Sequence, residues 1–293
     1  MSQCELLQTM VPVTLGDRAL FERYLSQYPP QISELTFTSI FCWAEVDRHL
    51  FCEYDGHLLV SFQAKDGSLH LLPPIGPEPV RIMSEEFPGF EQYSLASIHE
   101  HLAHQVERGS KWISDDASHD YVYRLPDLRS LQGKKHDGKR NFIRRFEKLG
   151  PDVRPLTKDD ALSCLHIQEQ WLESQKGNPS AKDESTAFMK CMQHFADLPL
   201  HGIGVFLEGR LVGFAIGEPL NKETFVEHFE KALPGYTGIY QFLLHAFVKS
   251  IPERFTYLNR EQDLGIEGLR KAKESWNPEF LQRKYRLKVR SSG

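Results

Sequence analysis

The spacing of apolar positions along the chain predicts the same succession of elements twice. In the first half, a short β-like run leads to Thr14 and, three residues later, Asp17, followed by a segment with apolar residues at helical spacing. In the second half, Thr157 and Asp160 precede a helix-like segment in the same way. Because this Thr-x-x-Asp pattern is similar to a capping box, each half is predicted to begin with a strand and a capped helix.

A hairpin signal follows the helix in each half. Asp55–Gly56 and Glu208–Gly209 each separate two β-rich runs, and Asp-Gly is a strong turn signal while Glu-Gly is a weaker one. The two landmarks recur in the same order, which indicates a duplicated unit; chance recurrence of a common pattern is the alternative. We predict an α+β fold with two domains, residues 1–130 and 131–293, each with a mixed, mostly antiparallel sheet flanked by helices. The second domain includes a basic linker helix.

Composition is that of a soluble globular protein of about two domains, with 293 residues, 40% hydrophobic and 26% charged. No run approaches the roughly 20 apolar residues of a membrane span, and the N-terminus lacks the basic and apolar regions of a signal peptide. The five cysteines are scattered without a Cys-x-x-Cys pair, which favours reduced thiols in a cytoplasm. The 13 histidines show no metal-ligand spacing, so we expect no metal site.

Charge is distributed unevenly. The net charge is −5, yet residues 129–148 contain eight basic and two acidic residues. A basic segment in an acidic chain indicates a polyanionic partner, such as RNA or the phosphates of a cofactor, although an ordinary solvated helix face is the alternative. The candidate polyanion-binding residues are Lys134, Lys135, Lys139, Arg140 and Arg144.

Most candidate chemistry lies between Thr224 and Pro278. The pattern there predicts a strand, a glycine turn, an apolar helix, a second strand, a polar turn and a basic helix. Polar residues gather where strand ends meet helix N-termini, which is where α/β folds place ligand sites. The candidate catalytic residues are Glu230, Arg260 and Asn259, and the candidate substrate- or cofactor-binding residues are Lys231, Gly235, Tyr236, Gly238, Tyr240, Glu261, Asp263, Arg270 and Lys273.

Glu227 and Glu230 are predicted to face opposite sides of their strand, because an odd number of positions separates them. Only one can then point at a substrate, and Glu230, directly before Lys231, is favoured. A part-buried carboxylate with a raised pKa can act as the general base for acylation of an amine or hydroxyl. A structural salt bridge is the alternative for Glu230.

Gly235 and Gly238 flank a turn at the start of the apolar helix. Free backbone N–H groups there can hold a phosphate or pyrophosphate, and the alternative is an ordinary chain reversal.

Arg260 stands at a strand end near Asp263, where its guanidinium can bind a carboxylate or phosphate with two hydrogen bonds. Asp263 can equally cap the next helix. We predict that Arg260 faces the same cavity as Glu230 and the turn of Gly235 and Gly238.

The C-terminal segment alternates, with Tyr285, Leu287 and Val289 on one side and Arg286, Lys288 and Arg290 on the other. This is typical of a half-buried strand with a basic outer face.

The order strand, glycine turn, helix, strand, helix and strand makes the second half resemble a GNAT acyltransferase domain. The segments HFEKALPGYTGIY and LNREQDLGIEGLRKAKESWNP together resemble the catalytic domain of bacterial phosphatidylglycerol lysyltransferases, and GKKHDGKRNFIRRF resembles the start of that family's second domain. The resemblance is strong over roughly residues 120–290. It implies two tandem GNAT-like domains, as in the Fem-type peptidyltransferases.

The resemblance implies a cytoplasmic acyltransferase, free or peripheral to a membrane, that moves an aminoacyl group from aminoacyl-tRNA to an amine or hydroxyl acceptor. Membrane-bound members use a lipid head group as acceptor, but this chain lacks their large transmembrane region, so a lipid and a small molecule both stay open. One alternative is an N-acyltransferase that uses acyl-CoA. The other is a non-catalytic binding protein on the same fold. No tightly bound cofactor is expected.

Overall fold

The fold is described from a computed structural model, which covers residues 9–86, 93–106, 112–175 and 178–287. Its contacts divide the chain into two compact units. The sequence predicts one boundary after residue 130. In the structure the first unit ends at Asp120 and also includes Gln262–Arg270 and Leu281–Gly293. The second unit contains Tyr121–Glu261 and Lys271–Phe280.

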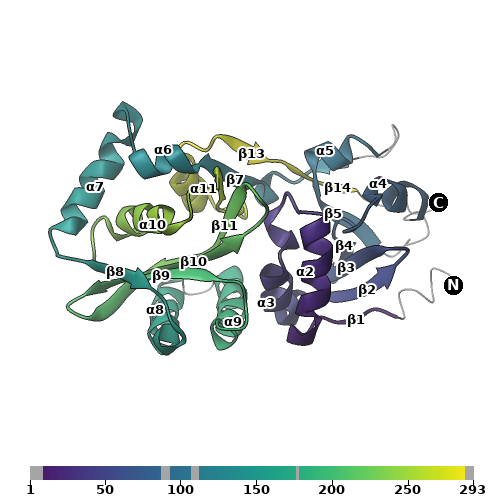
Figure 1. Ribbon diagram of the computed structural model, residues 1–293, viewed down its shortest axis with the longest axis horizontal. Helices are drawn as coiled ribbons and strands as arrows, with labels where there is room; N and C mark the ends of the chain where they lie inside the picture. The colour runs from purple at the N-terminus through teal and green to yellow at the C-terminus, as the bar shows by residue number, and fades with distance from the viewer. Residues whose placement is uncertain (1–8, 87–92, 107–111, 176–177, 288–293) are drawn as a thin grey trace. The chain divides into compact units, whose positions relative to one another are not determined.

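The first unit is built on a mixed sheet of seven strands within the described residues (Figure 1). Neighbouring strands are antiparallel except for β4 and β5, which are parallel. In spatial order the strands are β1 (Val11–Pro12), β2 (Leu50–Tyr54), β3 (His57–Gln63), β4 (Leu69–Leu71), β5 (Tyr93–His99), β14 (Lys284–Leu287) and β6 (Trp112–Ser114). The α-helices are α2 (Arg18–Gln27), α3 (Phe37–Asp47), α4 (Pro79–Arg81) and α5 (Glu100–Ala103).

Alternation along β2 sends neighbouring side chains to opposite faces of this sheet. Phe51 packs against Phe21 of α2, with ring centroids 5.2 Å apart, and Phe21 also packs against Phe37 of α3 at 5.4 Å. The next residue, Cys52, belongs to a separate buried cluster that includes Leu102 of α5. Helices therefore cover both faces of the first sheet.

The second unit also has a mixed sheet of seven strands within the described residues. Strands β8, β9, β10 and β11 pair in antiparallel succession, and β11 pairs with β12 in parallel. In spatial order the strands are β13 (Phe280–Gln282), β7 (Asp120–Arg124), β12 (Tyr257–Asn259), β11 (Thr224–Ala232), β10 (Arg210–Pro219), β9 (His201–Leu207) and β8 (Asp152–Pro155). The helices are α6 (Leu125–Ser130), α7 (Asp137–Glu147), α8 (Ala161–Ser174), α9 (Pro179–Gln193), α10 (Ile239–Ser250) and the end of α11 (Glu267–Glu274), which begins in the first unit.

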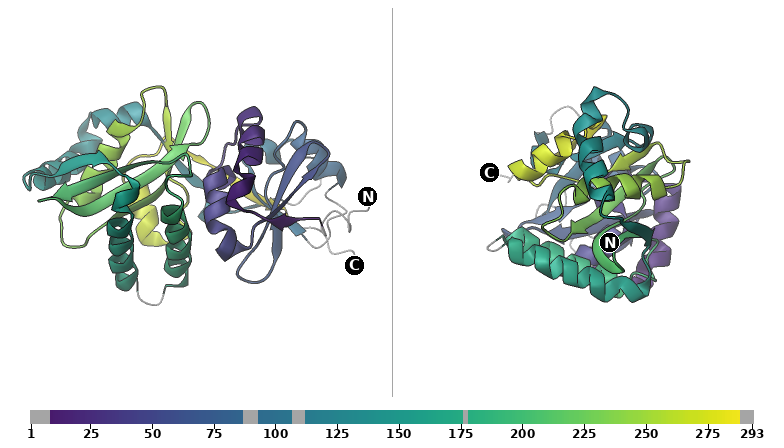
Figure 2. Two further views of the ribbon diagram at one scale, coloured as in Figure 1. Left: turned by 60° about the horizontal axis from the view of Figure 1, so that its bottom comes forward. Right: turned by 90° about the vertical axis from the view of Figure 1, so that its left-hand side faces the viewer.

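Two groups of helices cover the second sheet. Helix α10 packs against α6, α7 and the strands β9 to β11, while α8 packs against α9 and the strands β10 and β11. Figures 1 and 2 show α10 with α6 and α7 on one face of this sheet and the pair α8 and α9 on the other.

Each half of the sequence supplies a strand to the other half's sheet. β7, which follows β6 in the chain, lies between β12 and β13 in the second sheet. β14, which follows β13, lies between β5 and β6 in the first sheet. One strand next to the edge of each sheet is therefore contributed by the other half of the sequence, and a single cut in the chain cannot separate the two units.

The α+β prediction is confirmed, because both units combine a mixed sheet with flanking helices. Both predicted capping boxes also form: the Thr14 backbone N–H donates to the Asp17 carboxylate at 2.8 Å, and the Thr157 N–H donates to Asp160 at 2.9 Å. The predicted hairpins are β2 with β3 and β9 with β10. Within the described residues, no helix combines the length and apolarity that crossing a bilayer requires.

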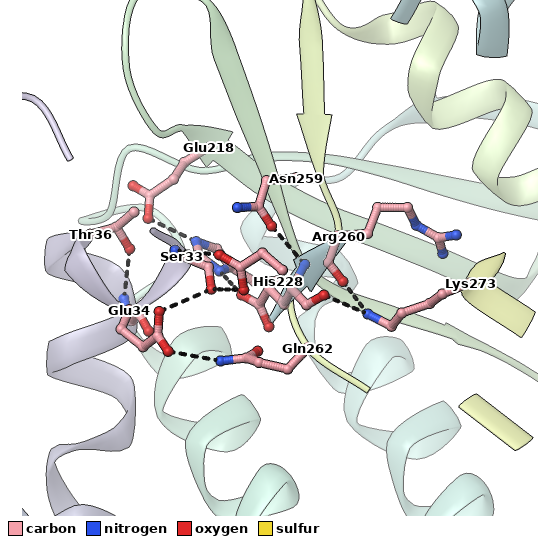
Figure 3. A network of polar contacts seen from close by, with 12 residues as sticks. Ser33, Glu34, Thr36, Glu218, His228, Asn259, Arg260, Gln262 and Lys273 are labelled. Atoms are coloured by element: carbon pink, nitrogen blue, oxygen red, sulfur yellow. Dashed lines mark hydrogen bonds and ion pairs between the residues drawn. The ribbon is translucent and has the colours of Figure 1, made fainter. Parts of the chain in front are cut away.

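A buried lysine holds β14 in the first unit. The Lys284 side chain is 0% exposed and its ammonium donates to Asp120 and to Glu34, each at 2.6 Å. Asp120 also accepts from the Ser33 hydroxyl at 2.9 Å, and Gln262 donates to Glu34 at 3.1 Å (Figure 3). Leu287 belongs to a buried cluster and Tyr285 packs against it, as predicted for the inner side of the strand. Lys288, Val289 and Arg290 lie outside the described residues. The burial of Lys284 was not predicted from the sequence.

We expect Lys284→Ala to destabilise the protein by about 3–5 kcal/mol, because it leaves a fully buried Asp120 carboxylate without its cation. Urea denaturation measures the change. The matched control on the same strand is Arg286→Ala, whose side chain is 49% exposed and pairs with Asp115 at 3.2 Å; it should cost less than about 1 kcal/mol. Equal losses for the two variants would contradict the role given to Lys284.

Candidate functional site

One extra residue in β11 decides which side chains share a face of the second sheet. Phe229 lies opposite Ile216 of β10. Glu227 lies opposite the next residue of β10, Gly217, so His228 has no partner residue in the ladder. This irregularity is a β-bulge, in which two residues of one strand oppose a single residue of its neighbour.

The bulge reverses the alternation of side chains along β11. Before it, Phe225 packs against Phe247 of α10, with ring centroids 6.0 Å apart. After it, Phe229 packs against Phe188 of α9 at 5.1 Å. In a regular strand, residues four positions apart face the same side, whereas these two phenylalanines contact helices on opposite faces.

Glu227 and Glu230 consequently face the same side, and the prediction that they face opposite sides is wrong because it assumed a regular strand. Both carboxylates bind Arg260. Its Nε donates to Glu227 Oε2 at 2.5 Å, and its terminal nitrogen donates to Glu230 Oε2. The exposed fractions of the side chains are only 11% for Arg260, 4% for Glu227 and 13% for Glu230, so water contributes little to their solvation.

The electrostatics of this cluster favour proton transfer at Glu230. Burial, followed by the charge of Glu227, raises the pKa of Glu230 to about 7, although Arg260 acts in the opposite direction. Burial alone would lower the pKa of Arg260, but the two carboxylates raise it, so Arg260 stays a cation. Near neutral pH, Glu230 can therefore both accept and release a proton.

Each of these carboxylates also has one buried oxygen, Oε1 of Glu227 and Oε1 of Glu230, with no hydrogen-bond partner among the described residues. Buried polar atoms are usually paired, so the two acceptors suit N–H or O–H donors of a bound molecule. In the part of the chain that the structure describes, no group of three or more His, Cys, Asp or Glu side chains is placed to hold a metal ion.

Arg260 is presented by a strained turn after β12. Glu261 has a left-handed φ of 56°, which is uncommon for a residue other than glycine. The fully buried Asn259 side chain accepts a hydrogen bond from the Glu261 backbone N–H at 2.8 Å. The Lys273 ammonium donates to the backbone carbonyls of Arg260 and Glu261 (Figure 3). Asn259 and Lys273 thus hold the turn that places the guanidinium.

His228 holds the same turn through a side chain. Its Nδ1 lies 2.7 Å from Glu261 Oε1, and its Nε2 lies 2.9 Å from Glu218 Oε1 (Figure 3). Burial alone would lower the pKa of His228, but hydrogen bonds and charges from the two carboxylates raise it to about 10. At neutral pH the imidazolium therefore donates to both carboxylates.

His228 and Glu218 were not predicted as site residues from the sequence. One signal was present in the sequence: Gly217 follows the second β-rich run of the predicted hairpin by two residues, and glycines inside strands often mark bulges. The structure explains this glycine, because a Cβ there would lie 2.0 Å from a backbone carbonyl oxygen of β11.

Lys231 and Tyr240 lie on different sides of the second sheet. Lys231 donates to Glu184 of α9 at 2.5 Å and lies 4.0 Å from the ring centroid of Trp171 in α8, so it is directed away from the Arg260 cluster. Tyr240, on α10, is close to Glu230: burial, followed by the charge of Glu230, raises the pKa of its hydroxyl to about 12.

The glycine turn before α10 is a close contact with α7. Gly235 and Gly238 have φ values of 93° and 90°. A Cβ on Gly238 would lie 2.3 Å from the Phe142 carbonyl oxygen, while a Cβ on Gly235 would meet nothing within 4 Å. Tyr236, between them, packs edge-on against Phe146 of α7 at 6.3 Å. Packing of α7 against the start of α10 therefore explains Gly238 without a ligand.

Asp263 and Arg270, two of the candidate binding residues, belong to the first unit. Asp263 is 1% exposed and accepts hydrogen bonds from the Gly265 N–H at 2.7 Å and from Arg270 Nε at 2.6 Å. These bonds hold the turn that leads into α11.

The basic segment does not form one continuous cationic face. Lys139 donates to the Ser275 hydroxyl at 2.6 Å and lies 4.5 Å from the ring centroid of Trp276. Burial, followed by the charge of Arg260, lowers the pKa of Lys139. Arg140 donates to two backbone carbonyls and to a carboxylate of its own helix. The remaining candidate polyanion-binding residues are exposed: Lys134, Lys135 and Arg144.

FemX shares this two-unit fold at 9% identity and a TM-score of 0.58, over 94% of this chain and 96% of that chain. The chain belongs to the family described as phosphatidylglycerol lysyltransferase, C-terminal, which matches residues 25–288. The resemblance identified from the sequence segments is therefore confirmed at the level of the family.

The chain is also similar to several solved structures and to one further protein by sequence. A conserved protein of unknown function from Bacteroides thetaiotaomicron VPI-5482 is 28% identical with a TM-score of 0.88, over 95% of this chain and 98% of that chain. L-PGS from Bacillus licheniformis shares the fold at 18% identity and a TM-score of 0.65, over 94% of this chain and 93% of that chain. An uncharacterised protein of Mycoplasmoides gallisepticum is 24% identical over 183 residues, and the match spans 60% of this chain and only 58% of that relative.

We expect Glu230→Gln to gain stability relative to the unchanged protein as the pH rises from about 6 to about 8. The pKa of Glu230 in the folded state, about 7, lies above its ordinary value of 4.5. Around pH 7 the unfolded chain has already released this proton, whereas the folded protein still binds it in part. The free energy of unfolding of the unchanged protein therefore falls by about 1 kcal/mol between pH 6 and pH 8. Urea denaturation at both pH values measures the difference, with Glu208→Gln in the exposed hairpin as control. Parallel pH profiles for all three proteins would contradict the raised pKa.

We expect Gly238→Ala to destabilise the protein more than Gly235→Ala. Both positions have left-handed φ values, so each substitution costs about 1 kcal/mol from the backbone. Only at Gly238 does the new methyl group also meet the Phe142 carbonyl, which adds about 1–3 kcal/mol. Thermal denaturation compares the two, and equal losses would mean that α7 moves aside at no cost.

Proposed function

We propose that the protein transfers an aminoacyl group from aminoacyl-tRNA to an amine or hydroxyl acceptor, at a site in the second unit. The observation that carries this proposal is the buried cluster of Arg260, Glu227 and Glu230. Within it, Glu230 has a pKa of about 7 and one oxygen without a partner among the described residues. A general base needs both a pKa near the working pH and an available acceptor atom.

In the proposed reaction, Glu230 takes the proton of the acceptor's N–H or O–H as that atom attacks the ester carbonyl of the aminoacyl donor. The bond between this carbonyl carbon and the ribose oxygen of the tRNA then breaks. Glu230 returns the proton to the ribose oxygen, so the protein ends with its starting charge. Arg260 keeps an anionic partner in Glu227 while Glu230 is protonated, which limits the movement of the guanidinium.

The choice of donor rests on the family and on the glycine turn. Aminoacyl-tRNA is the donor that the family resemblance implies. An acyl-CoA donor would place its pyrophosphate at the turn before α10, where the Phe142 carbonyl oxygen lies against Gly238. A carbonyl oxygen repels phosphate oxygens, so this contact favours aminoacyl-tRNA over acyl-CoA.

The acceptor class follows from the family as well. The family description names phosphatidylglycerol, and a lipid head group with a free hydroxyl suits the two carboxylate oxygens without partners. We accordingly propose a lipid head group as acceptor and a cytoplasmic location at the membrane surface. A small-molecule amine is the alternative acceptor.

The test is transfer of a labelled aminoacyl group from aminoacyl-tRNA to lipid vesicles or to small amines. Glu230→Gln should lower the transfer rate by on the order of a hundredfold or more, because the amide cannot accept the proton. Arg260→Lys should lower it by roughly tenfold or more, since a lysine keeps the charge but cannot bridge two carboxylates in a fixed plane. Both variants should remain folded.

Arg254→Lys, at an exposed position of the same unit, is the matched control and should keep the full rate. Full transfer by Glu230→Gln would refute the role of the base. Thermal stabilisation by acetyl-CoA but not by aminoacyl-tRNA would assign the acyl-CoA reaction instead. No transfer to any acceptor and no stabilisation by either donor would identify a non-catalytic binding protein.

A further inference from the structure

Helix α7 carries an exposed surface that combines apolar and basic side chains. Phe142 is 41% exposed and Leu149, directly after the helix, is 53% exposed. Arg144, Arg145 and Lys148 are exposed beside them. We call these five residues the α7 surface. Large apolar side chains that are this exposed and flanked by bases usually mark a place of interaction.

The spacing of these residues arranges them in two adjacent stripes. Phe142 and Arg145 are three positions apart, so they lie on the same side of α7. Leu149 follows the C-terminal cap of the helix, Lys148. The Arg145 guanidinium lies 6.0 Å from the Phe142 ring centroid. Lys148 and Arg144 lie further round the helix, while Ile143 and Phe146 are buried on the inner side. The helix therefore has a packed inner face, an apolar edge and a basic outer face.

The charges of the α7 surface are available to a partner. Within the described residues, no ion pair is found for Arg144, Arg145 or Lys148, and all three side chains are exposed. By contrast, the neighbouring Lys139 and Arg140 are held by contacts within the second unit. The bases thus complement an anionic surface, and their attraction should weaken as salt increases.

The apolar residues decide between two kinds of anionic partner. RNA would use the bases through its phosphates, and an aromatic ring could stack on a nucleotide. An aliphatic side chain such as Leu149 cannot stack in this way, and neither can Val153, which is 37% exposed shortly after it. Aliphatic and aromatic groups next to Lys and Arg are instead the combination that enters the interface of an anionic bilayer.

The α7 surface belongs to the same unit as the candidate site. Helix α7 packs against α10, and the backbone carbonyl of Phe142 lies against Gly238 at the start of α10. This contact joins the α7 surface to the helix that follows the strand of Glu227 and Glu230 in the chain.

We propose that the α7 surface docks the protein on an anionic lipid bilayer, with Phe142 and Leu149 in the interface and Arg144, Arg145 and Lys148 among the head groups. This goes beyond the proposed function, because docking needs neither donor nor transfer. Docking would bring the protein to a lipid acceptor although none of its described helices can span a bilayer.

The test is co-sedimentation with vesicles of phosphatidylcholine alone or mixed with phosphatidylglycerol, without any donor. The unchanged protein should bind the anionic vesicles and bind the neutral ones far less. Arg144→Gln with Lys148→Gln should weaken binding by about 25-fold, on the basis of about fivefold for each base near the surface. Phe142→Ser with Leu149→Ser should weaken binding by about tenfold or more.

Two exposed positions of the same unit provide matched controls: Leu162→Ser, at a leucine that is 80% exposed on α8, and Lys222→Gln. Both should bind like the unchanged protein. No binding to anionic vesicles, or full binding by Phe142→Ser with Leu149→Ser, would overturn the proposal. Binding of a structured RNA that depends on Arg144 and Lys148 but not on Phe142 and Leu149, without vesicle binding, would overturn it in favour of a nucleic acid. Because no donor is present, failure here is distinct from failure of aminoacyl transfer.

Discussion

Arg260 brings a permanent positive charge into a part of the second unit that water scarcely reaches, and its side chain is only 11% exposed. Removing such a charge from water is costly unless hydrogen-bonded anions replace the solvent. Glu227 and Glu230 supply that replacement, and they can do so only because the bulge at His228 turns both toward the same side of β11. The raised pKa of Glu230 follows from the same arrangement, since two carboxylates share one cation within a buried volume.

The bulge also links the cluster to its support. The residue that it leaves without a strand partner, His228, bridges Glu218 and Glu261, and Glu261 belongs to the turn that presents Arg260. Asn259 and Lys273 bind the backbone of that turn from two other elements. The turn has an unfavourable backbone conformation at Glu261, and several independent contacts are the usual condition under which such strain persists at a site.

The exchange of β7 and β14 explains why the units do not coincide with the halves of the sequence. Each sheet needs a strand from the other half to complete it, so residues at the end of the chain contribute to the core of the first unit. Lys284 shows the consequence: a fully buried ammonium near the C-terminus neutralises Glu34 and Asp120. Neither unit is therefore one continuous segment of the chain.

The amino-acid sequence by itself determined the features that depend on near neighbours. The capping boxes at Thr14 and Thr157 and the hairpin turns follow from residues within a few positions of one another, where local sterics and hydrogen bonding decide. The family resemblance rests on the same local segments. For this reason the fold class and the region of the candidate site were predictable.

Only the tertiary structure decided which of these polar groups meet. The pairing of β11 with β10 introduces the bulge, and this single change of register overturned the expected orientation of Glu227. The exchange of strands buries Lys284, and the packing of α7 on Gly238 closes a turn that could otherwise have held a phosphate. Each of these outcomes depends on contacts between segments far apart in the chain, and side-chain alternation carries no information about register until two strands are paired.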